Sequence, residues 1–329
     1  MKSFEKTTGG RVQEAIAGKR TLVIGGRGFI GTHLVSALLE AGSLVTSLSL
    51  SGGAGRSERE SVEYLTADLR SPESLGKVLA GRGFDYVINA GGYIDHRLYF
   101  SGGRDLIAQH FLGTMNLLDL VAGRDLKGYV QLGSSDEYGP LDPPQGEDMR
   151  EMPISPYSAA KVASAQLLQM LHRSEGVPAA VVRLFLSYGP GQEGSRFLPQ
   201  VIKGCLADRV FKTSEGMQLR DFCYVTDVVK AILLAMVVKE AHGRVINVAS
   251  GRPVSIREVI ERVVSLVGGG KPDFGRVPYR IGENMALYAD TARAAEILGW
   301  RPLVSLDEGL KKTIAWYRNR MGLDGASDA

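Results

Sequence analysis

The chain has 329 residues, 44% of them hydrophobic and 23% charged, a composition typical of a folded globular protein with one large domain or two smaller ones. A formal net charge of +3 gives no indication of a nucleic-acid partner, and no apolar run reaches the roughly 18 residues that span a bilayer. Two cysteines exclude a disulfide framework, and the five scattered histidines form no metal-ligand pair. We therefore expect a cytoplasmic protein with no metal site and no membrane association.

Short apolar runs alternate with helical patterns along the first half of the chain. After an N-terminal extension of residues 1–18, we predict strands at 20–24, 44–50, 61–65, 84–89, 128–132 and 179–185, and helices at 33–42, 71–79, 105–121 and from 157 onward. Helices between successive strands are typical of parallel βαβ units, so the sequence predicts an α/β fold with a doubly wound parallel sheet.

This alternation loosens after Tyr188, where the strands become shorter and charged helices separate them. We assign residues 19–186 and 221–246 to the first domain. Residues 187–220 and 247–329 are assigned to a smaller C-terminal α/β domain that binds the substrate.

A glycine-rich loop joins the first predicted strand to the first helix. Gly25 permits a tight turn, Gly28 lets a pyrophosphate approach the backbone, and Gly31 lets the helix pack closely on the strand. The N-terminus of the helix that follows offers unpaired N–H groups and the positive end of its dipole to phosphate, and we assign Phe29 and Ile30 of the loop to the same cofactor site. A strand–loop–helix context predicts dinucleotide binding rather than a purely structural turn.

The identity of the dinucleotide depends on the end of the second strand. An acidic residue there would bind the adenosine ribose 2′-hydroxyl, but the position holds Ser49, and residues 44–57 contain no Asp or Glu. Arg27 in the glycine loop and Arg56 beyond the strand can pair with a 2′-phosphate. We therefore expect NADP, with NAD as the alternative if both arginines are only solvated surface charges.

Residues after two further strands are assigned to the same cofactor site. Asp68 either accepts a hydrogen bond from the adenine amino group or caps the helix that follows it, and Leu69 is its neighbour. Ala90, Gly91 and Gly92 follow the strand at 84–89 and complete the predicted cofactor contacts.

A tyrosine and a lysine open the helix that follows the strand at 128–132. Tyr157 and Lys161 are four residues apart, so their side chains share one helix face, and the ammonium is expected to lower the pKa of the phenol from about 10. Such a phenol can exchange a proton with a carbonyl or carbinol oxygen while hydride moves. Ser134 can hydrogen-bond the same oxygen, and Lys161 can also hold the nicotinamide ribose. A lone Tyr-x-x-x-Lys pair is usually a surface pair, but after a dinucleotide loop we interpret it as catalytic.

These motifs together resemble the extended short-chain dehydrogenase/reductase family of nucleotide-sugar epimerases, dehydratases and reductases. The resemblance covers residues 20–318 and rests on GGRGFIG at 25–31, SSDEYG at 134–139, YSAAK at 157–161, RLFLSYGPGQ at 183–192, RDFCYVTDV at 220–228, INVASG at 246–251 and LGWRP at 298–302. It implies a Rossmann-type large domain that binds NAD(P) and a small domain that binds a nucleoside-diphosphate sugar.

The resemblance also implies roles for residues of the small domain. Arg220 matches the family arginine that binds the diphosphate of the sugar nucleotide. Arg280 and Glu283 match the Arg-x-Gly-Asp pattern that contacts the diphosphate and the nucleoside ribose. Bidentate guanidinium–phosphate bonds suit that role, and the alternative is that Arg220 and Arg280 are plain surface charges.

The chain departs from the family pattern at several positions. Leu186 replaces an asparagine that contacts the substrate, His110 replaces the asparagine before Gly-Thr in the long helix, and Gly91-Gly92 replaces Ala-Ala. His96, in the loop that follows, either reaches the sugar or is an ordinary loop residue. We include Leu186 and His96 among the candidate substrate contacts.

The expected reaction depends on the SSDEYG motif. The family's 4,6-dehydratases carry Thr-Asp-Glu before Val-Tyr-Gly, with Asp as acid and Glu as base. Counting back from Gly139 places Ser134, Ser135 and Asp136 at these positions, whereas a gap of one residue would align residues 135–137 instead. Without the acid, dehydration is disfavoured, and we assign Ser135 and Asp136 to substrate binding.

The same motif is more similar to reductases of 4-keto-6-deoxy nucleotide sugars. We therefore expect an NADP-dependent reductase of a nucleotide-linked 4-keto-6-deoxyhexose, in deoxysugar and surface-polysaccharide biosynthesis, with hydride added at C4 and Tyr157 as acid. The alternatives are a 4-epimerase or 4,6-dehydratase with tightly bound NAD, and a non-catalytic NADP-sensing protein. The family's pairing of two long helices, here 105–121 and 157–174, implies a homodimer.

Overall fold

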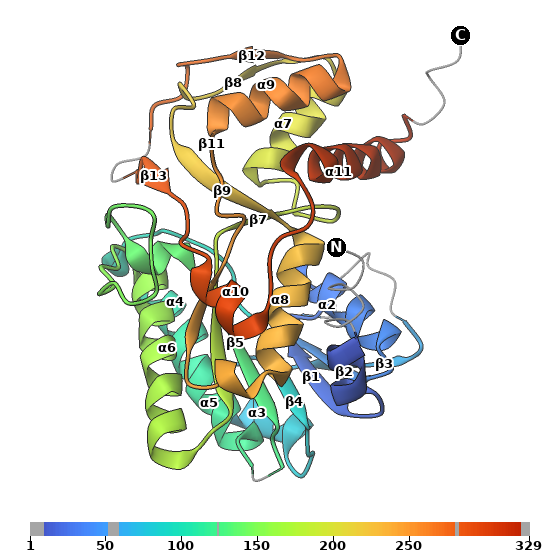
Figure 1. Cartoon of the computed structure of the whole chain (residues 1–329), viewed down its shortest axis with the longest axis vertical. Helices are drawn as coiled ribbons and strands as arrows, with labels where there is room; N and C mark the ends of the chain where they lie inside the picture. Colours follow the sequence, from blue (N-terminus) through green and yellow to red (C-terminus); the bar gives the residue numbers. More distant parts are fainter. Residues whose placement is uncertain (1–9, 52–58, 124, 280–282, 324–329) are drawn as a thin grey trace.

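The computed structural model describes residues 10–51, 59–123, 125–279 and 283–323, which form a larger and a smaller lobe (Figure 1). The larger lobe contains a seven-stranded sheet in which all neighbouring strands are parallel, in the order β10-β6-β5-β4-β1-β2-β3. These strands are β1 (Arg20–Ile24), β2 (Leu44–Ser49), β3 (Val62–Thr66), β4 (Tyr86–Asn89), β5 (Gly128–Ser134), β6 (Ala179–Leu184) and β10 (Val245–Val248). The predicted doubly wound α/β fold is confirmed.

Strand order runs outward from the centre of this sheet in both directions. Its switch point lies between β1 and β4, and ligands of open α/β sheets bind in the crevice at the carboxyl ends of the strands there. The glycine loop follows β1 and residues 90–92 follow β4, so the fold alone brings these two segments together.

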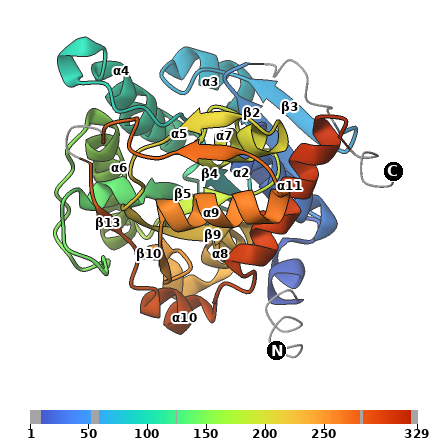
Figure 2. The ribbon, with the colours of Figure 1, turned by 90° about the horizontal axis from the view of Figure 1, so that it is seen from above.

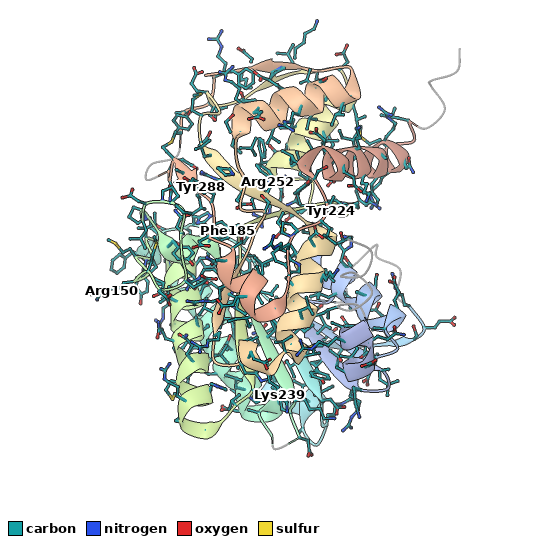
Figure 3. All side chains as sticks on the ribbon, viewed as in Figure 1. Arg150, Phe185, Tyr224, Lys239, Arg252 and Tyr288 are labelled. Carbon is teal, nitrogen blue, oxygen red and sulfur yellow. The ribbon has the colours of Figure 1, made fainter. Side chains whose placement is uncertain are left out.

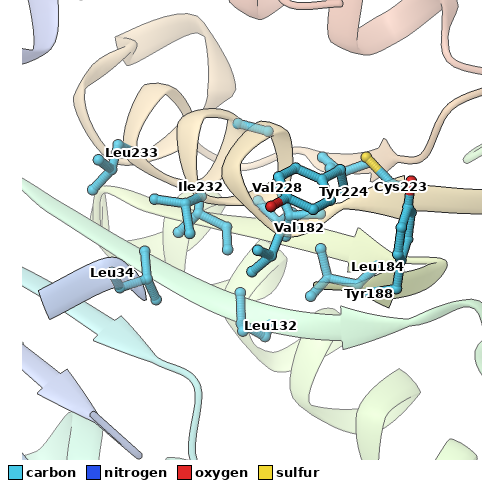
Figure 4. Close-up of a cluster of buried hydrophobic side chains, with 14 of the residues drawn as sticks. Leu34, Leu132, Val182, Leu184, Tyr188, Cys223, Tyr224, Val228, Ile232 and Leu233 are labelled. Carbon is cyan, nitrogen blue, oxygen red and sulfur yellow. The ribbon is translucent and has the colours of Figure 1, made fainter. Parts of the chain in front are cut away.

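Helices cover both faces of the sheet (Figure 1). One face packs against α2 (Phe29–Glu40) and α8 (Val225–Val237), and the other against α3 (Pro72–Leu79), α5 (Gly113–Val121) and α6 (Pro156–Glu175). Because both faces are buried, successive residues of β1 enter different cores: Leu22 packs with α3 and α5, and Val23 with α2 and α8. Figure 4 shows the α8 side of this core, with side chains of α8 against those of β5 and β6.

The helix predicted at 105–121 is interrupted. It consists of α4 (Arg104–Ile107), a π-helical segment η2 (Ala108–Leu112) and α5. Extra residues inserted in a π-helical turn rotate the side chains around it, and such turns are frequent at functional sites. Here the π-helical segment contains His110 and packs against α6.

The smaller lobe contains two sheets of short strands. β9 (Leu219–Tyr224) pairs with β7 (Leu186–Tyr188), β11 (Pro253–Ser255) and β13 (Ala286–Leu287), while β8 (Val210–Lys212) pairs with β12 (Lys271–Asp273). The helices α7 (Phe197–Leu206), α9 (Ile256–Val267) and α11 (Leu306–Arg320) pack in this lobe, as Figure 2 shows from above. In Figure 3, Phe185, Tyr224, Arg252 and Tyr288 lie where the two lobes meet.

Two segments differ from the expected division of the chain. Residues 221–224, expected in the first domain, belong to β9 and so to a sheet of the smaller lobe; the chain returns to the larger lobe at Val225. α10 (Ala292–Leu298), expected in the smaller domain, packs against β10 and α8 of the larger lobe. Strand pairing explains the first difference, because β9 is held by β7 and β11.

The N-terminal extension contributes to the core where it is described. Residues 10–16 are helical, and Ile16 is fully buried against the α2 side of the sheet. No helix among residues 10–51, 59–123, 125–279 and 283–323 is long and apolar enough to cross a membrane.

Candidate active site

The loop between β1 and α2 leaves no space for a side chain at Gly25, Gly26 and Gly31. Gly25 has a φ of +74°, which glycine adopts readily, and its N–H donates to the Leu48 carbonyl at 2.7 Å. A Cβ on Gly31 would lie 2.0 Å from the Gly25 carbonyl oxygen, and one on Gly26 would lie 2.3 Å from the Ser47 hydroxyl. The tight turn and the close helix packing therefore match the geometry that the sequence predicts.

A pocket of about 350 Å³ lies at the carboxyl ends of β1, β2 and β4. Tyr93 and Gln109 line it, and no motif had marked Gln109. Phe29, Ile30 and Gly31 form the first turn of α2 and are not among its lining residues. The expected cofactor contacts that do line the pocket are Gly25, Arg27, Gly28, Ser49, Leu69, Ala90, Gly91 and Gly92.

Two features of the pocket fit a dinucleotide. Gly28, the N-cap residue of α2, makes no side-chain cap, so the N–H groups of the first turn are available for a phosphate. The Ser49 hydroxyl is buried and has no hydrogen-bond partner among the described residues, so it can bind a ribose hydroxyl or a ribose phosphate.

Arg27 is held on the β2–β3 side of this pocket. Its Nη1 donates to the Ser51 carbonyl at 3.1 Å, and its guanidinium lies 4.6 Å from the centre of the Tyr64 ring. Arg27 is therefore near Ser49, as the expected 2′-phosphate contact requires. Arg56, the second expected contact, lies outside the described residues.

Asp68 does not cap the helix that follows it. The N-cap of α3 is Ser71, whose hydroxyl accepts a hydrogen bond from the Ser74 N–H at 3.1 Å. Both carboxylate oxygens of Asp68 accept hydrogen bonds from Arg70, at 2.7 to 3.1 Å, and this contact lowers the pKa of Asp68. The capping interpretation is wrong, and the adenine contact stays a prediction.

Tyr157 and Lys161 lie in the first two turns of α6, where Ser155 caps the helix and Pro156 occupies the first helical position. Both side chains are buried, and Lys161 Nζ lies 5.8 Å from the centre of the Tyr157 ring. Lys161 Nζ also donates to the Leu132 carbonyl of β5 at 2.7 Å.

The expected catalytic residues meet at the carboxyl end of β5, but their electrostatics differ from the expectation. Burial raises the pKa of Tyr157, the Asp136 carboxylate raises it further, and the contact with the Ser134 hydroxyl lowers it. Burial also lowers the pKa of Lys161 to about 8. The expected lowering of the Tyr157 pKa is wrong, because the loss of water around a phenolate dominates in this buried setting.

His96 and Asp136 come from different loops and lie beside Tyr157. The His96 ring is edge-on to the Tyr157 ring, with 6.2 Å between the ring centres, and its Nε2 lies 3.8 Å from Asp136 Oδ2. Both side chains are partly exposed, so a ligand can reach them. The structure therefore brings two of the expected substrate contacts to Tyr157.

His110 fills space left by a neighbouring glycine. Its ring packs edge-on against Tyr157 at 5.0 Å between centres, and its Nε2 lies 2.9 Å from the Tyr93 carbonyl oxygen. Burial lowers the pKa of His110 to about 3, so the ring is neutral near pH 7. A Cβ on Gly92 would lie 2.2 Å from His110 Cε1, so these two departures from the family pattern are sterically linked.

Ser135 is buried in the turn η3 (Ser135–Tyr138), next to two residues that sequence reasoning missed. Glu137 of this turn and Arg183 of β6 are fully buried and form an ion pair at 2.7 Å. An arginine within an otherwise apolar strand pattern, AAVVRLF, was the available signal, because a buried charge requires a partner.

Of the expected diphosphate contacts, Arg220 and Glu283 lie in the smaller lobe. Arg220 of β9 forms an ion pair with Glu283, and both side chains are mostly buried. Arg280 lies outside the described residues. Leu186 is half-buried in β7, packs against the larger hydrophobic core and pairs with Phe222 through its backbone.

Comparison with known proteins gives the wider context of this site. The chain is 31% identical to the UDP-glucose 4-epimerase of Mycolicibacterium smegmatis, with 92% of this chain and 99% of that protein covered. It is 30% identical to the dTDP-glucose 4,6-dehydratase of Streptomyces griseus, with 90% and 93% covered. The crystal structure of UDP-glucose 4-epimerase from Thermotoga maritima with UDP-glucose superimposes with a TM-score of 0.84, at 27% identity over 92% of this chain and 99% of that one.

These relatives are epimerases and dehydratases, so the expected closeness to 4-keto-6-deoxy sugar reductases is not shown. Residues 21–249 match the NAD dependent epimerase/dehydratase family. They include the glycine loop, Ser134, Tyr157, Lys161 and Arg220. The chain therefore belongs to the NAD dependent epimerase/dehydratase family.

Proposed function

We propose that this protein is a nucleotide-sugar 4-epimerase that retains its nicotinamide dinucleotide between turnovers. The observation that carries the proposal is the meeting of Ser134, Tyr157 and Lys161 at the carboxyl end of β5, in the same lobe as the glycine-loop pocket, on a chain similar to 4-epimerases over nearly its whole length. Arg220, in the smaller lobe, would bind the diphosphate of the substrate.

The chain's own residues account for the proton transfers. Bound oxidised nicotinamide supplies the hydride acceptor at C4 and a positive charge, which favours the phenolate form of Tyr157. Tyr157 takes the proton of the sugar 4-hydroxyl and returns it when the 4-ketone is reduced from its other face. Ser134 donates a hydrogen bond to the same oxygen, and the Lys161 ammonium would hold the nicotinamide ribose.

The turn after β5 argues against dehydration. Removal of water across C5 and C6 needs an acid at the leaving hydroxyl, and Ser135, at the position of the family's acid, is a buried serine. Asp136 is a partly exposed carboxylate beside His96, and its neighbour Ser135 is not the acid that dehydration would need. A 4-epimerase needs neither, because Tyr157 serves both half-reactions.

A second candidate, an NADP-dependent 4-keto sugar reductase, is favoured by the adenosine end of the pocket. Arg27 and the unpaired Ser49 hydroxyl suit a 2′-phosphate, and residues 44–51 bring no carboxylate to repel it. A net reductant is drawn from free NADPH, whereas an epimerase regenerates its own cofactor.

Mass spectrometry of the nucleotides released from purified protein, and NMR of the products from UDP-glucose and dTDP-glucose, test the proposal. We expect retained NAD and inversion at C4 without added cofactor. Consumption of added NADPH with a 4-keto-6-deoxy nucleotide sugar, and no C4 inversion, would establish the second candidate. Release of a 4-keto-6-deoxy product would establish a dehydratase and overturn both.

A further inference from the structure

The turn that carries Ser134 rests on a buried pair of opposite charges. Arg183 donates from Nε and Nη2 to Glu137 Oε2, at 3.0 and 2.7 Å, and both side chains are fully buried. Nη2 also donates to Glu151 Oε1 at 2.8 Å, and the guanidinium lies 4.5 Å from the centre of the Tyr138 ring. Glu151 and Tyr138 therefore hold the Arg183 guanidinium in place, and the guanidinium holds the Glu137 carboxylate.

The second oxygen of Glu137 fixes the backbone of Ser134. Oε1 accepts a hydrogen bond from the Ser134 N–H at 2.7 Å, and Ser134 Oγ accepts one from the Asp136 N–H at 3.2 Å, which completes a capping box. A Cβ on Gly133 would lie 2.6 Å from the same oxygen, so the turn is shaped around this carboxylate. Glu137 thus fixes the Ser134 backbone, and the hydroxyl that projects from it is held by the Asp136 N–H of the same turn.

Glu137 and Lys161 bond to the backbone of β5 two residues apart: Lys161 Nζ donates to the Leu132 carbonyl at 2.7 Å, and Glu137 Oε1 accepts from the Ser134 N–H at 2.7 Å. Burial raises the pKa of Glu137, while Arg183 and the Ser134 N–H favour its charged form. The charge of Glu137 raises the pKa of Lys161 against the effect of burial. The other titratable groups around Lys161 are His110 of η2, Tyr157 of its own helix, and Arg183 of β6 behind Glu137.

We propose that Glu137, held by Arg183, is a positioning residue for the reaction: it fixes the backbone that carries the Ser134 hydroxyl and supplies the negative charge that keeps Lys161 protonated. This inference rests on the proposed function for the roles of Ser134 and Lys161. A Glu137–Arg183 pair with a structural role alone would also affect the stability of the fold. The test therefore needs measurements that a change in stability does not alter.

Three variants separate the two roles. Glu137→Gln removes the charge and keeps an acceptor for the Ser134 N–H. Glu137→Asp keeps the charge and shortens the side chain, so it loses that hydrogen bond. Glu151→Gln is the matched control, because Glu151 contacts the same guanidinium and makes no contact with Ser134.

NMR titration of ¹³C-labelled lysine, with the Lys161 signal assigned from a Lys161→Met variant, measures the charge effect without any activity. We expect the Lys161 midpoint to fall by roughly one pH unit in Glu137→Gln, with the alkaline limb of kcat moving to lower pH by the same amount. In Glu137→Asp the midpoint stays and kcat falls roughly tenfold to a hundredfold at unchanged KM. Glu151→Gln should change neither the Lys161 midpoint nor kcat.

The double variant Glu137→Gln/Arg183→Met serves if Glu137→Gln does not fold, because it also removes the buried guanidinium that has lost its Glu137 partner and leaves only the 13% exposed Glu151 without Arg183. The inference is overturned if the Lys161 midpoint stays at the wild-type value in Glu137→Gln and in the double variant. It is also overturned if kcat is unchanged in Glu137→Asp. A shifted midpoint in a protein that inverts no sugar supports the charge effect and counts against the proposed function alone.

Discussion

The two lobes hold their site residues by different means. In the larger lobe, the glycine loop at the pocket is closely packed backbone: a Cβ on Gly25 would lie 2.7 Å from the Ala90 carbonyl oxygen, and one on Gly31 would lie 2.0 Å from the Gly25 carbonyl oxygen. In the smaller lobe, the candidate diphosphate contact is a side chain in an exchangeable ion pair, Arg220 with Glu283.

This difference explains why one half of the site is easier to recognise than the other. A backbone cradle tolerates only glycine, so it leaves a fixed pattern of residues in the sequence. A side-chain contact can be replaced or re-paired one residue at a time, so it carries the differences in substrate among proteins with one fold. Changes in the glycine loop should therefore abolish cofactor binding, and changes in the smaller lobe should alter sugar binding alone.

The largest effect is expected from Gly31→Ala. Its Cβ cannot be accommodated against the Gly25 carbonyl, so the loop must move, at a cost of about 1–3 kcal/mol in the free energy of unfolding, and NAD is no longer retained. Thermal unfolding and nucleotide release measure both. Gly76→Ala in α3, where nothing lies within 4 Å of the added Cβ, is the control and should be neutral or slightly stabilising.

Tyr157→Phe should separate chemistry from binding. Loss of the phenolic hydroxyl removes the proton donor and acceptor and should lower kcat by about 10²- to 10⁴-fold, while retained NAD and thermal stability stay near wild type. Tyr99→Phe, at an exposed position of η1 (Tyr99–Ser101), should behave as wild type. Substantial turnover by Tyr157→Phe would exclude Tyr157 as the acid.

Arg220→Met should affect the sugar half only. Losing charge-assisted bonds to a diphosphate costs about 1.5–3 kcal/mol, which raises KM for the nucleotide sugar roughly tenfold to a hundredfold and leaves NAD retention unchanged. Steady-state kinetics and isothermal titration with the nucleoside diphosphate measure this. Arg262→Met, which breaks ion pairs with Glu258 and Asp307 on the same lobe, is the control, and an equal rise in its KM would contradict the assignment.

The last effect concerns stability at low pH and comes from His110. Its pKa is lowered to about 3 in the folded protein from 6.5, so between these values only the unfolded chain binds the proton. Stability therefore falls by roughly 1.4 kcal/mol per pH unit as the pH drops through this window. His110→Gln should flatten that loss, as measured by denaturant unfolding between pH 7 and pH 4. An unchanged slope would show that the imidazole is not buried in its neutral form.

The sequence alone was enough to locate the glycine-loop end of the candidate site. The strand at 20–24, the glycine turn and the helix after it are local features, so hydrophobic period and glycine spacing were enough to place Gly25, Gly28 and Gly31 at the pocket or its edge. It erred on the Tyr157 pKa, because burial of the phenol is a property of the folded environment. It also left Asp68 open, and only the helix cap at Ser71 excluded one of its two roles.

The sequence by itself determined the alternation of strands and helices, the dinucleotide loop and the Tyr-x-x-x-Lys pair, because each depends on residues close together in the chain. Only the tertiary structure decided which distant residues meet: Glu137 with Arg183, His110 with Gly92, Arg220 with Glu283, and His96 with Asp136. Such pairs form through strand order and helix packing, which bring together positions that no local periodicity connects.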